Sequence, residues 1–83
     1  MKILYFAWVR QKAGLSEETV ELPGDIKTLN DLVGWLKARG PEFEAAFADI
    51  KSVRAAIDQA HASLDASIEG AKEIAFFPPV TGG

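Results

Sequence analysis

The residues that could carry chemistry stand at the end of the chain, where Gly82 and Gly83 follow Pro78-Pro79-Val80-Thr81. Glycine has no Cβ, so its backbone can enter a narrow channel and approach a nucleotide or a catalytic group closely. A terminal carboxylate is a poor electrophile, but an acyl-adenylate gives it a good leaving group. A sulfur donor can then displace AMP and leave a thiocarboxylate. The terminus therefore predicts activation and sulfur loading at Gly83.

The composition also indicates that the chain end is the reactive group. The 83 residues contain no cysteine and one histidine, and their formal net charge is −3. A chain without cysteine has no disulfide framework, no thiolate nucleophile and no cysteine-ligated zinc. Its charges are interspersed, without the basic stripe of a nucleic-acid binder. We therefore expect no metal site, no nucleic-acid partner and no place for sulfur other than the terminus.

Several stretches predict the strands that must hold this tail. The alternation and the aromatic or β-branched content are typical of strands. They predict strands at 2–10, 17–22, 53–58 and 73–77, a turn at 11–16 containing Gly14, and a short edge strand within 59–72. Pro78 and Pro79 end the last strand and project the tail, because proline lacks the N–H that a further ladder needs.

Two helices are expected between the second and third strands. Thr28 is the predicted N-cap of the main helix, and its apolar stripe is Leu29, Leu32, Val33 and Leu36. Gly40 is expected to cap this helix in the left-handed conformation and Pro41 to prevent its continuation. A shorter helix from Glu42 carries Phe43, Ala46, Phe47 and Ile50 at the same spacing.

This order of elements predicts an α+β fold. One main helix packs on one face of a mixed sheet, with a short second helix, as in the ubiquitin-like β-grasp. Residues 1–77 form the domain and residues 78–83 the projecting tail. The apolar run at 3–9 is short for a signal peptide and is followed by Arg10 and Lys12, and no stretch is long enough to span a membrane. We therefore expect a cytoplasmic protein with no membrane partner.

Strand parity assigns the two faces of the sheet. Because adjacent strand residues point to opposite faces, Phe76 and Phe77 cannot both face the helix. The first strand assigns Ile3, Tyr5, Ala7 and Val9 to the core, leaving Phe6 and Phe77 on the uncovered face. An exposed aromatic patch on a small protein indicates a partner surface. The alternative is that the short helix or the 59–72 loop covers one of them.

The chain resembles the small subunits of molybdopterin synthase. The resemblance rests on the end Ile74-Ala75-Phe76-Phe77-Pro78-Pro79-Val80-Thr81-Gly82-Gly83, on the opening Ile3-Leu4-Tyr5-Phe6-Ala7 with Val9-Arg10, and on Val53-Arg54-Ala55-Ala56-Ile57-Asp58-Gln59. It covers nearly the whole chain at matching length.

The resemblance implies a reaction cycle. An activating enzyme uses ATP to adenylate Gly83, and a persulfide donor supplies sulfur. The thiocarboxylate then enters the active site of the synthase large subunit, in a heterotetramer, and donates sulfur to the molybdopterin dithiolene. On this reading the chain has no catalytic side chain of its own and binds no cofactor permanently.

The resemblance also suggests which residues contact partners. His61 matches, by position, a family residue on that surface, although a lone loop histidine is more often only solvated. Arg10 could pair with an acidic group on a partner or be merely solvated. The partner-binding set is Phe6, Arg10, His61, Phe77, Pro78, Pro79, Val80 and Thr81. Trp8 and Trp35 are expected to be packing residues.

Three alternatives remain at this point. The chain could carry sulfur for thiazole synthesis or tRNA thiolation, which would use the same fold and diglycine. It could be a ubiquitin-like modifier that forms isopeptide bonds, in which case Gly83 would end as an amide to a lysine. It could also be an interaction module with incidental glycines.

Overall fold

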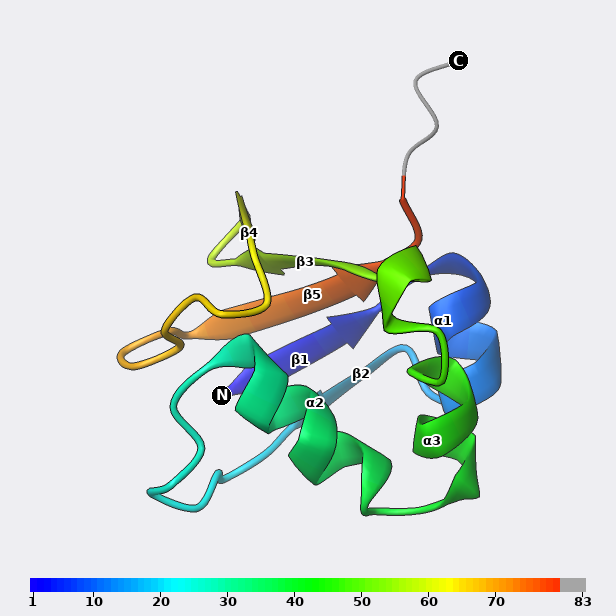
Figure 1. Ribbon diagram of the computed structural model, residues 1–83, viewed down its shortest axis with the longest axis horizontal. Coiled ribbons are helices and arrows are strands. Elements are labelled where there is room, and N and C mark those ends of the chain that lie inside the picture. Colours follow the sequence, from blue (N-terminus) through cyan, green and yellow to red (C-terminus); the bar gives the residue numbers. More distant parts are fainter. Residues whose placement is uncertain (80–83) are drawn as a thin grey trace.

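The last strand lies in the middle of the sheet. The computed structural model describes residues 1–79, and their strands form one sheet in the order β2-β1-β5-β3-β4 (Figure 1). The strands are β1 (Lys2–Tyr5), β2 (Glu17–Thr19), β3 (Arg54–Ile57), β4 (Ala60–Ala62) and β5 (Glu73–Phe77). β1 and β5 are parallel, and the other neighbouring pairs are antiparallel. This is the mixed sheet of a β-grasp fold, as predicted.

The first strand is shorter than predicted. β1 ends at Tyr5, and α1 (Ala7–Ala13) begins after Phe6, so the predictions of a strand over 2–10 and of a turn over 11–16 are wrong. The chain turns at Ala7, whose φ is 53°. Val9 and Ala13 are buried on one side of α1, as the helical period requires, whereas Ala7 is exposed and does not belong to the core. β2 is likewise shorter than the predicted 17–22.

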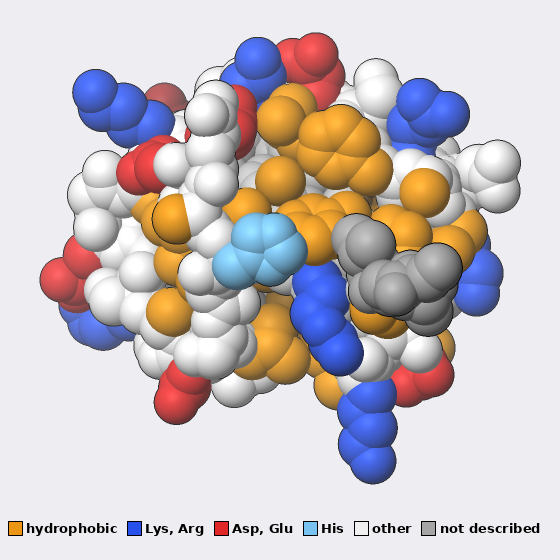
Figure 2. Space-filling model, turned by 90° about the horizontal axis from the view of Figure 1, so that it is seen from above, with side chains coloured by type: hydrophobic (Ala, Val, Ile, Leu, Met, Phe, Trp, Pro, Cys, Tyr) orange, Lys and Arg blue, Asp and Glu red, His pale blue; other side chains and the backbone are white. Residues whose placement is uncertain are grey.

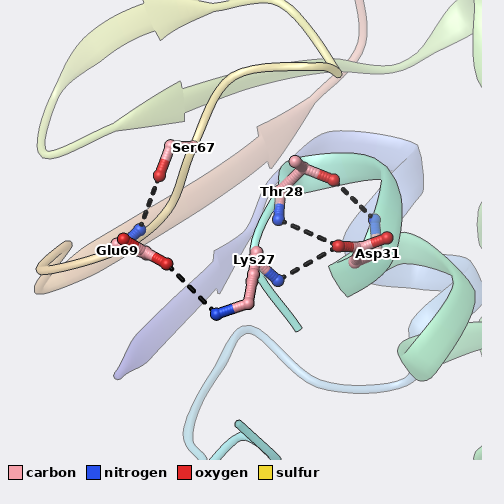
Figure 3. Close-up of polar contacts among 5 residues, drawn as sticks. All are labelled: Lys27, Thr28, Asp31, Ser67 and Glu69. Carbon is pink, nitrogen blue, oxygen red and sulfur yellow. Dashed lines mark hydrogen bonds and ion pairs between the residues drawn. The ribbon is translucent and has the colours of Figure 1, made fainter. Parts of the chain in front are cut away.

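The main helix has the predicted start and the predicted buried stripe. In α2 (Leu29–Lys37) the Thr28 hydroxyl accepts a hydrogen bond from the Asp31 N–H at 3.1 Å. The Asp31 carboxylate accepts in return from the Thr28 N–H at 3.2 Å (Figure 3). This capping box satisfies N–H groups that a helix start leaves free. Lys27 also pairs with Glu69 at 3.3 Å, which ties the helix start to the loop before β5.

The end of this helix differs from the prediction. α2 is followed by Ala38 in right-handed geometry, so Gly40 is not its left-handed cap. Gly40 instead precedes α3 (Pro41–Ala46), and Pro41 is the first residue of that helix. Proline suits this position because its missing N–H would have no partner there. A 3-10 turn, η1 (Ile50–Ser52), leads into β3. The described residues therefore hold three α-helices, where two were predicted.

The core lies between the sheet and helices α2 and α3. Leu29, Leu32 and Leu36 of α2 are fully buried, as are Ile3 and Ile74 of the sheet. Around Phe76, which is also fully buried, aromatic side chains cluster. Its ring lies 4.9 Å from that of Phe47, edge to face, and 6.2 Å from that of Tyr5. Phe76 therefore joins the last strand to the helical layer, as strand parity predicted.

The β3–β4 turn holds two non-glycine residues in left-handed backbone geometry. Asp58 and Gln59 form the two-residue loop and have φ values of 48° and 73°. Asp58 serves the fold in this position, because its carboxylate accepts hydrogen bonds from the N–H groups of Lys72 and Glu73 at 2.9 Å each. No side-chain hydrogen bond is found for Gln59 among the described residues, so its conformation carries strain without compensation.

Replacing Gln59 with glycine should therefore stabilise the protein. We expect the free energy of unfolding to rise by roughly 0.5–1 kcal/mol in urea denaturation, since glycine adopts positive φ without a Cβ clash. Ala60→Gly in the adjoining strand is the control and should lower it, because glycine weakens a strand. A loss of stability in Gln59→Gly would show that Gln59 is not strained.

A polar cluster joins β2 to the segment after α2. The Tyr5 hydroxyl donates to Glu18 at 2.7 Å, and Arg39 donates to both carboxylate oxygens of Glu18 at 2.8 and 2.9 Å. Burial alone would raise the pKa of the Glu18 carboxyl. The hydrogen bonds from Arg39 and Tyr5, with the positive charge of Arg39, outweigh burial and hold that pKa below its ordinary value. The folded protein therefore favours ionised Glu18.

This cluster predicts a pH-dependent contribution to stability. Because the pKa of Glu18 is lower in the folded state, its contribution is complete above the unfolded pKa of about 4.3 and is lost as the pH falls through the folded pKa. Glu18→Gln should lose roughly 1–3 kcal/mol of unfolding free energy at pH 7. Urea denaturation across this pH range measures the difference in unfolding free energy between Glu18→Gln and the unmodified protein. This difference should decrease toward low pH, and a difference that stays constant with pH would contradict the assignment.

Candidate functional site

The tail leaves the body at the end of the central strand. The Phe6 N–H donates to the Phe76 carbonyl at 3.0 Å, which fixes the carboxyl end of β5 beside the start of α1. Pro78 and Pro79 follow and are half-buried. The predicted boundary between domain and tail after residue 77 therefore coincides with the end of β5. Val80, Thr81, Gly82 and Gly83 lie outside the described residues, so their roles remain predictions.

A groove lies at the root of the tail. It has a volume of about 470 Å³ and is lined by Trp8, Lys12, Asp49, Ser52, Pro78 and Pro79. The Lys12 ammonium lies 5.2 Å from the centre of the Trp8 ring, and the Ser52 hydroxyl donates to Asp49 at 2.8 Å. Trp8 was expected to be a packing residue. It is half-buried, and one part of it faces this groove.

The sheet face turned away from α2 and α3 is here called the open face. The register places Leu4, Ala75, Ala56 and His61 in one row across β1, β5, β3 and β4, and pairs Phe77 with Arg54. The small side chain of Ala56, between Ala75 and His61 in this row, is buried. Figure 2 shows hydrophobic side chains gathered around the histidine on the side seen from above.

The structure brings Phe77 and His61 together on the open face. Their rings lie 5.3 Å apart in an edge-on arrangement. Phe77 is half-buried and His61 exposed. Phe6 is 46% exposed and is the one large hydrophobic residue among those described that is classed as exposed. Phe76 is buried and Phe77 lies against His61, as strand parity predicted, whereas Phe6 follows the end of β1 and only its exposure is confirmed.

Arg10 lies on α1 and not at a strand end. Its N–H donates to the Phe6 carbonyl at 3.2 Å, so it stands one helical turn beyond Phe6, and its side chain is exposed. Sequence reasoning missed Arg54 and Lys12, which the structure places next to Phe77 and to Pro78-Pro79 respectively. The alternation of Arg54 with Ala55 in a strand that begins opposite Phe77 was the available signal for Arg54. No sequence signal indicated Lys12, because its position at the groove depends on α1, which was not predicted.

Within residues 1–79 no group of three His, Asp or Glu side chains could hold a metal ion. No helix in that part of the chain is long and apolar enough to cross a membrane. The described residues offer an apolar surface, with cations near the point where the tail begins.

Comparisons with known proteins match the whole chain. A family model described as the ThiS family matches residues 3–83. The molybdopterin synthase sulfur carrier subunit of Escherichia coli (strain K12) is 36% identical over 83 residues, covering 100% of this chain and 99% of that protein.

Two solved structures share the fold. The putative molybdopterin converting factor, subunit 1, from Pyrococcus furiosus has a TM-score of 0.74 and 30% identity, covering 95% of each chain. The small archaeal modifier protein 1 of H. volcanii has a TM-score of 0.72 and 28% identity, covering 96% of this chain and 97% of that one. Their similarity agrees with the predicted β-grasp fold.

Proposed function

Because the chain belongs to the ThiS family, over residues 3–83, we propose that it is a sulfur carrier in molybdenum cofactor biosynthesis, the small subunit of a molybdopterin synthase. The observation that carries the proposal is the full-length identity of 36% with a sulfur carrier subunit of that enzyme. The position of the tail supports it, since β5 ends in a proline pair at the margin of an apolar face.

The reacting group is the Gly83 carboxylate. An ATP-dependent activating enzyme joins it to AMP and releases pyrophosphate. A persulfide sulfur donor then displaces AMP, and reductive cleavage of the resulting acyl disulfide by a thiol leaves the thiocarboxylate. ATP is thus a substrate of the activating enzyme and not a cofactor held by this chain. Gly82 keeps the approach to Gly83 free of side chains.

The open face supports docking on the large subunit. Phe6 is substantially exposed in the isolated chain, and Phe77 and His61 lie edge to face beside the root of the tail. Burial of such aromatic side chains against a partner supplies binding free energy, while the tail enters the partner's active site. General acid and base groups then belong to the partner. We propose that the exposed Arg10, one helical turn beyond Phe6, contacts the margin of this interface.

A second candidate is a protein modifier. It is favoured by the similarity to small archaeal modifier protein 1, which covers nearly all of both chains. Both candidates require activation of Gly83, and they differ in what becomes of it. Mass mapping of Gly83-containing peptides from cells would find an amide to a lysine if the modifier candidate holds.

Reconstitution tests the first candidate. The thiocarboxylated chain, mixed with a purified molybdopterin synthase large subunit and the pterin precursor, should yield molybdopterin. The same chain without sulfur loading is the control and should yield none. Loading that proceeds while no molybdopterin forms would contradict the assignment to this pathway and favour another thiolation route.

A further inference from the structure

Three cationic residues from three different elements lie near the root of the tail. Lys12, on α1, lines the groove with Pro78 and Pro79. Arg54, on β3, is the register partner of Phe77. Lys51, on η1, is joined to Arg54 because the Arg54 guanidinium donates to the Lys51 carbonyl at 2.8 Å. These three residues are here called the basic rim.

The charges of the basic rim are available to a partner. All three side chains are exposed, and none forms a salt bridge within residues 1–79. Among the other cations of residues 1–79, Lys2 pairs with Glu17, Lys27 with Glu69 and Arg39 with Glu18, whereas Arg10, Lys37 and Lys72 form no salt bridge. Asp49 is the one acidic residue that lines the groove at the tail root, and it is engaged by Ser52.

The basic rim contrasts with the net charge of the chain. The chain as a whole is acidic, with a formal net charge of −3, whereas three cations that form no salt bridge within residues 1–79 give the end of the molecule at Phe77 and Pro78 a local positive charge. Figure 2 shows Lys and Arg side chains at the margin of the hydrophobic patch on this end. An asymmetric charge distribution orients a protein in the field of its partner before contact.

We propose that the basic rim steers the chain, tail first, onto acidic side chains that surround the tail-receiving cleft of the synthase large subunit. This inference rests on the proposed function and names the chemistry of the partner surface. The cations lie beside the apolar face, which supplies the contacts of the complex. We therefore expect the cations to raise mainly the rate of association. Electrostatic complementarity at the rim of an interface acts mainly in this way.

The arrangement fits acidic protein side chains better than a nucleotide or a nucleic acid. The three cations stand on separate elements, and only Lys12 lines the groove that Pro78, Pro79 and Asp49 also line. A phosphate site would gather its donors on one point, and a nucleic-acid site would extend them along a stripe with stacking aromatics.

Charge reversal with a matched control tests the steering. Lys51→Glu/Arg54→Glu reverses two of the three rim charges, and Lys37→Glu/Lys72→Glu changes the net charge equally at residues outside both the basic rim and the groove at the tail root. Stopped-flow association with the purified large subunit is measured from low to high salt. We expect the rim variant to associate about 10-fold more slowly at low salt and the control to stay within about twofold of the unmodified chain. The difference should shrink as salt screens the charges.

Other outcomes overturn the inference. Equal slowing of both variants would mean that net charge alone matters. A slowing that does not depend on salt would mean lost contacts and not steering. Slowing by the rim variant that inorganic phosphate, and not chloride at equal ionic strength, reproduces in the unmodified chain would indicate a phosphate site instead. Sulfur loading of Gly83, followed separately by mass, reports on the proposed function whichever way these rates fall.

Discussion

Deleting Gly83 should abolish sulfur loading completely while leaving the protein folded. The reacting carboxylate would then sit on Gly82, one residue short of the position that the activating enzyme reaches. Replacing Gly82 with tryptophan should have the same effect, because its side chain would obstruct the channel that a glycine backbone can enter. Mass spectrometry after incubation with the activating enzyme, ATP and a sulfur donor measures loading, and circular dichroism melts measure folding.

A glycine in the body of the protein supplies the control. A Cβ added at Gly24 would meet no atom within 4 Å, so Gly24→Ala should change neither loading nor stability. If the chain without Gly83 still restores molybdopterin formation with purified partners, the carrier assignment is wrong. If it fails only because the protein unfolds, the tail would contribute to the core, contrary to our account.

The neighbouring residues Phe76 and Phe77 should respond oppositely to truncation. Phe76 is fully buried against Phe47 and Tyr5, so Phe76→Ala should cost roughly 3–5 kcal/mol of unfolding free energy, as core phenylalanines do. Phe77 is half-buried on the open face, where its ring meets His61. Phe77→Ala should therefore change stability little and weaken binding to the large subunit by more than about 1 kcal/mol.

Thermal melts and calorimetric titration of both variants measure the two effects. Each variant is the control for the other, since they remove the same ring from adjacent positions of β5. A collapse of the melting temperature in Phe77→Ala, with Phe76→Ala benign, would mean that the partner surface lies on the opposite face of the sheet.

Some of these elements could be predicted because local signals agree with the tertiary structure. β5 has the predicted bounds, since its alternation is strict and Pro78 prevents its continuation. α2 begins at the predicted cap, since Thr28 and Asp31 form a capping box and the four apolar residues that follow face the core. Phe76 and Phe77 were assigned correctly because strand parity depends on nothing beyond the strand.

The break after Tyr5 could not be read from the sequence. Residues 3–9 are apolar without interruption, which is compatible with a buried strand, and a left-handed alanine at position 7 has no local signal. The burial of Val9 and Ala13 four residues apart is a helical spacing, but the alanine made that stripe weak. Missing α1 also meant missing the tail-root groove, because Trp8 and Lys12 reach it only from a helix.

The site was predictable only in part, because some of its residues are brought together by elements such as α1 that the sequence did not indicate. Phe77 lies where parity placed it, with its ring against that of His61, and Phe6 is exposed as predicted, while their contacts with a partner stay predictions. The cations of the basic rim come from three elements that are distant in sequence, so their gathering depends on the packing of α1, η1 and β3. Gly40 was misplaced because the stop signal of one helix and the start signal of the next use the same residues, glycine and proline.

Intact mass spectrometry of the chain tests the central claim most directly. The protein is incubated with a purified activating enzyme, ATP and a sulfur source, with and without ATP. The account predicts a mass gain equal to the exchange of one oxygen for one sulfur, only with ATP, and fragment ions that place the gain on Gly83. Adenylation of Gly83 without any exchange of oxygen for sulfur, or a stable amide between Gly83 and a lysine, would contradict it.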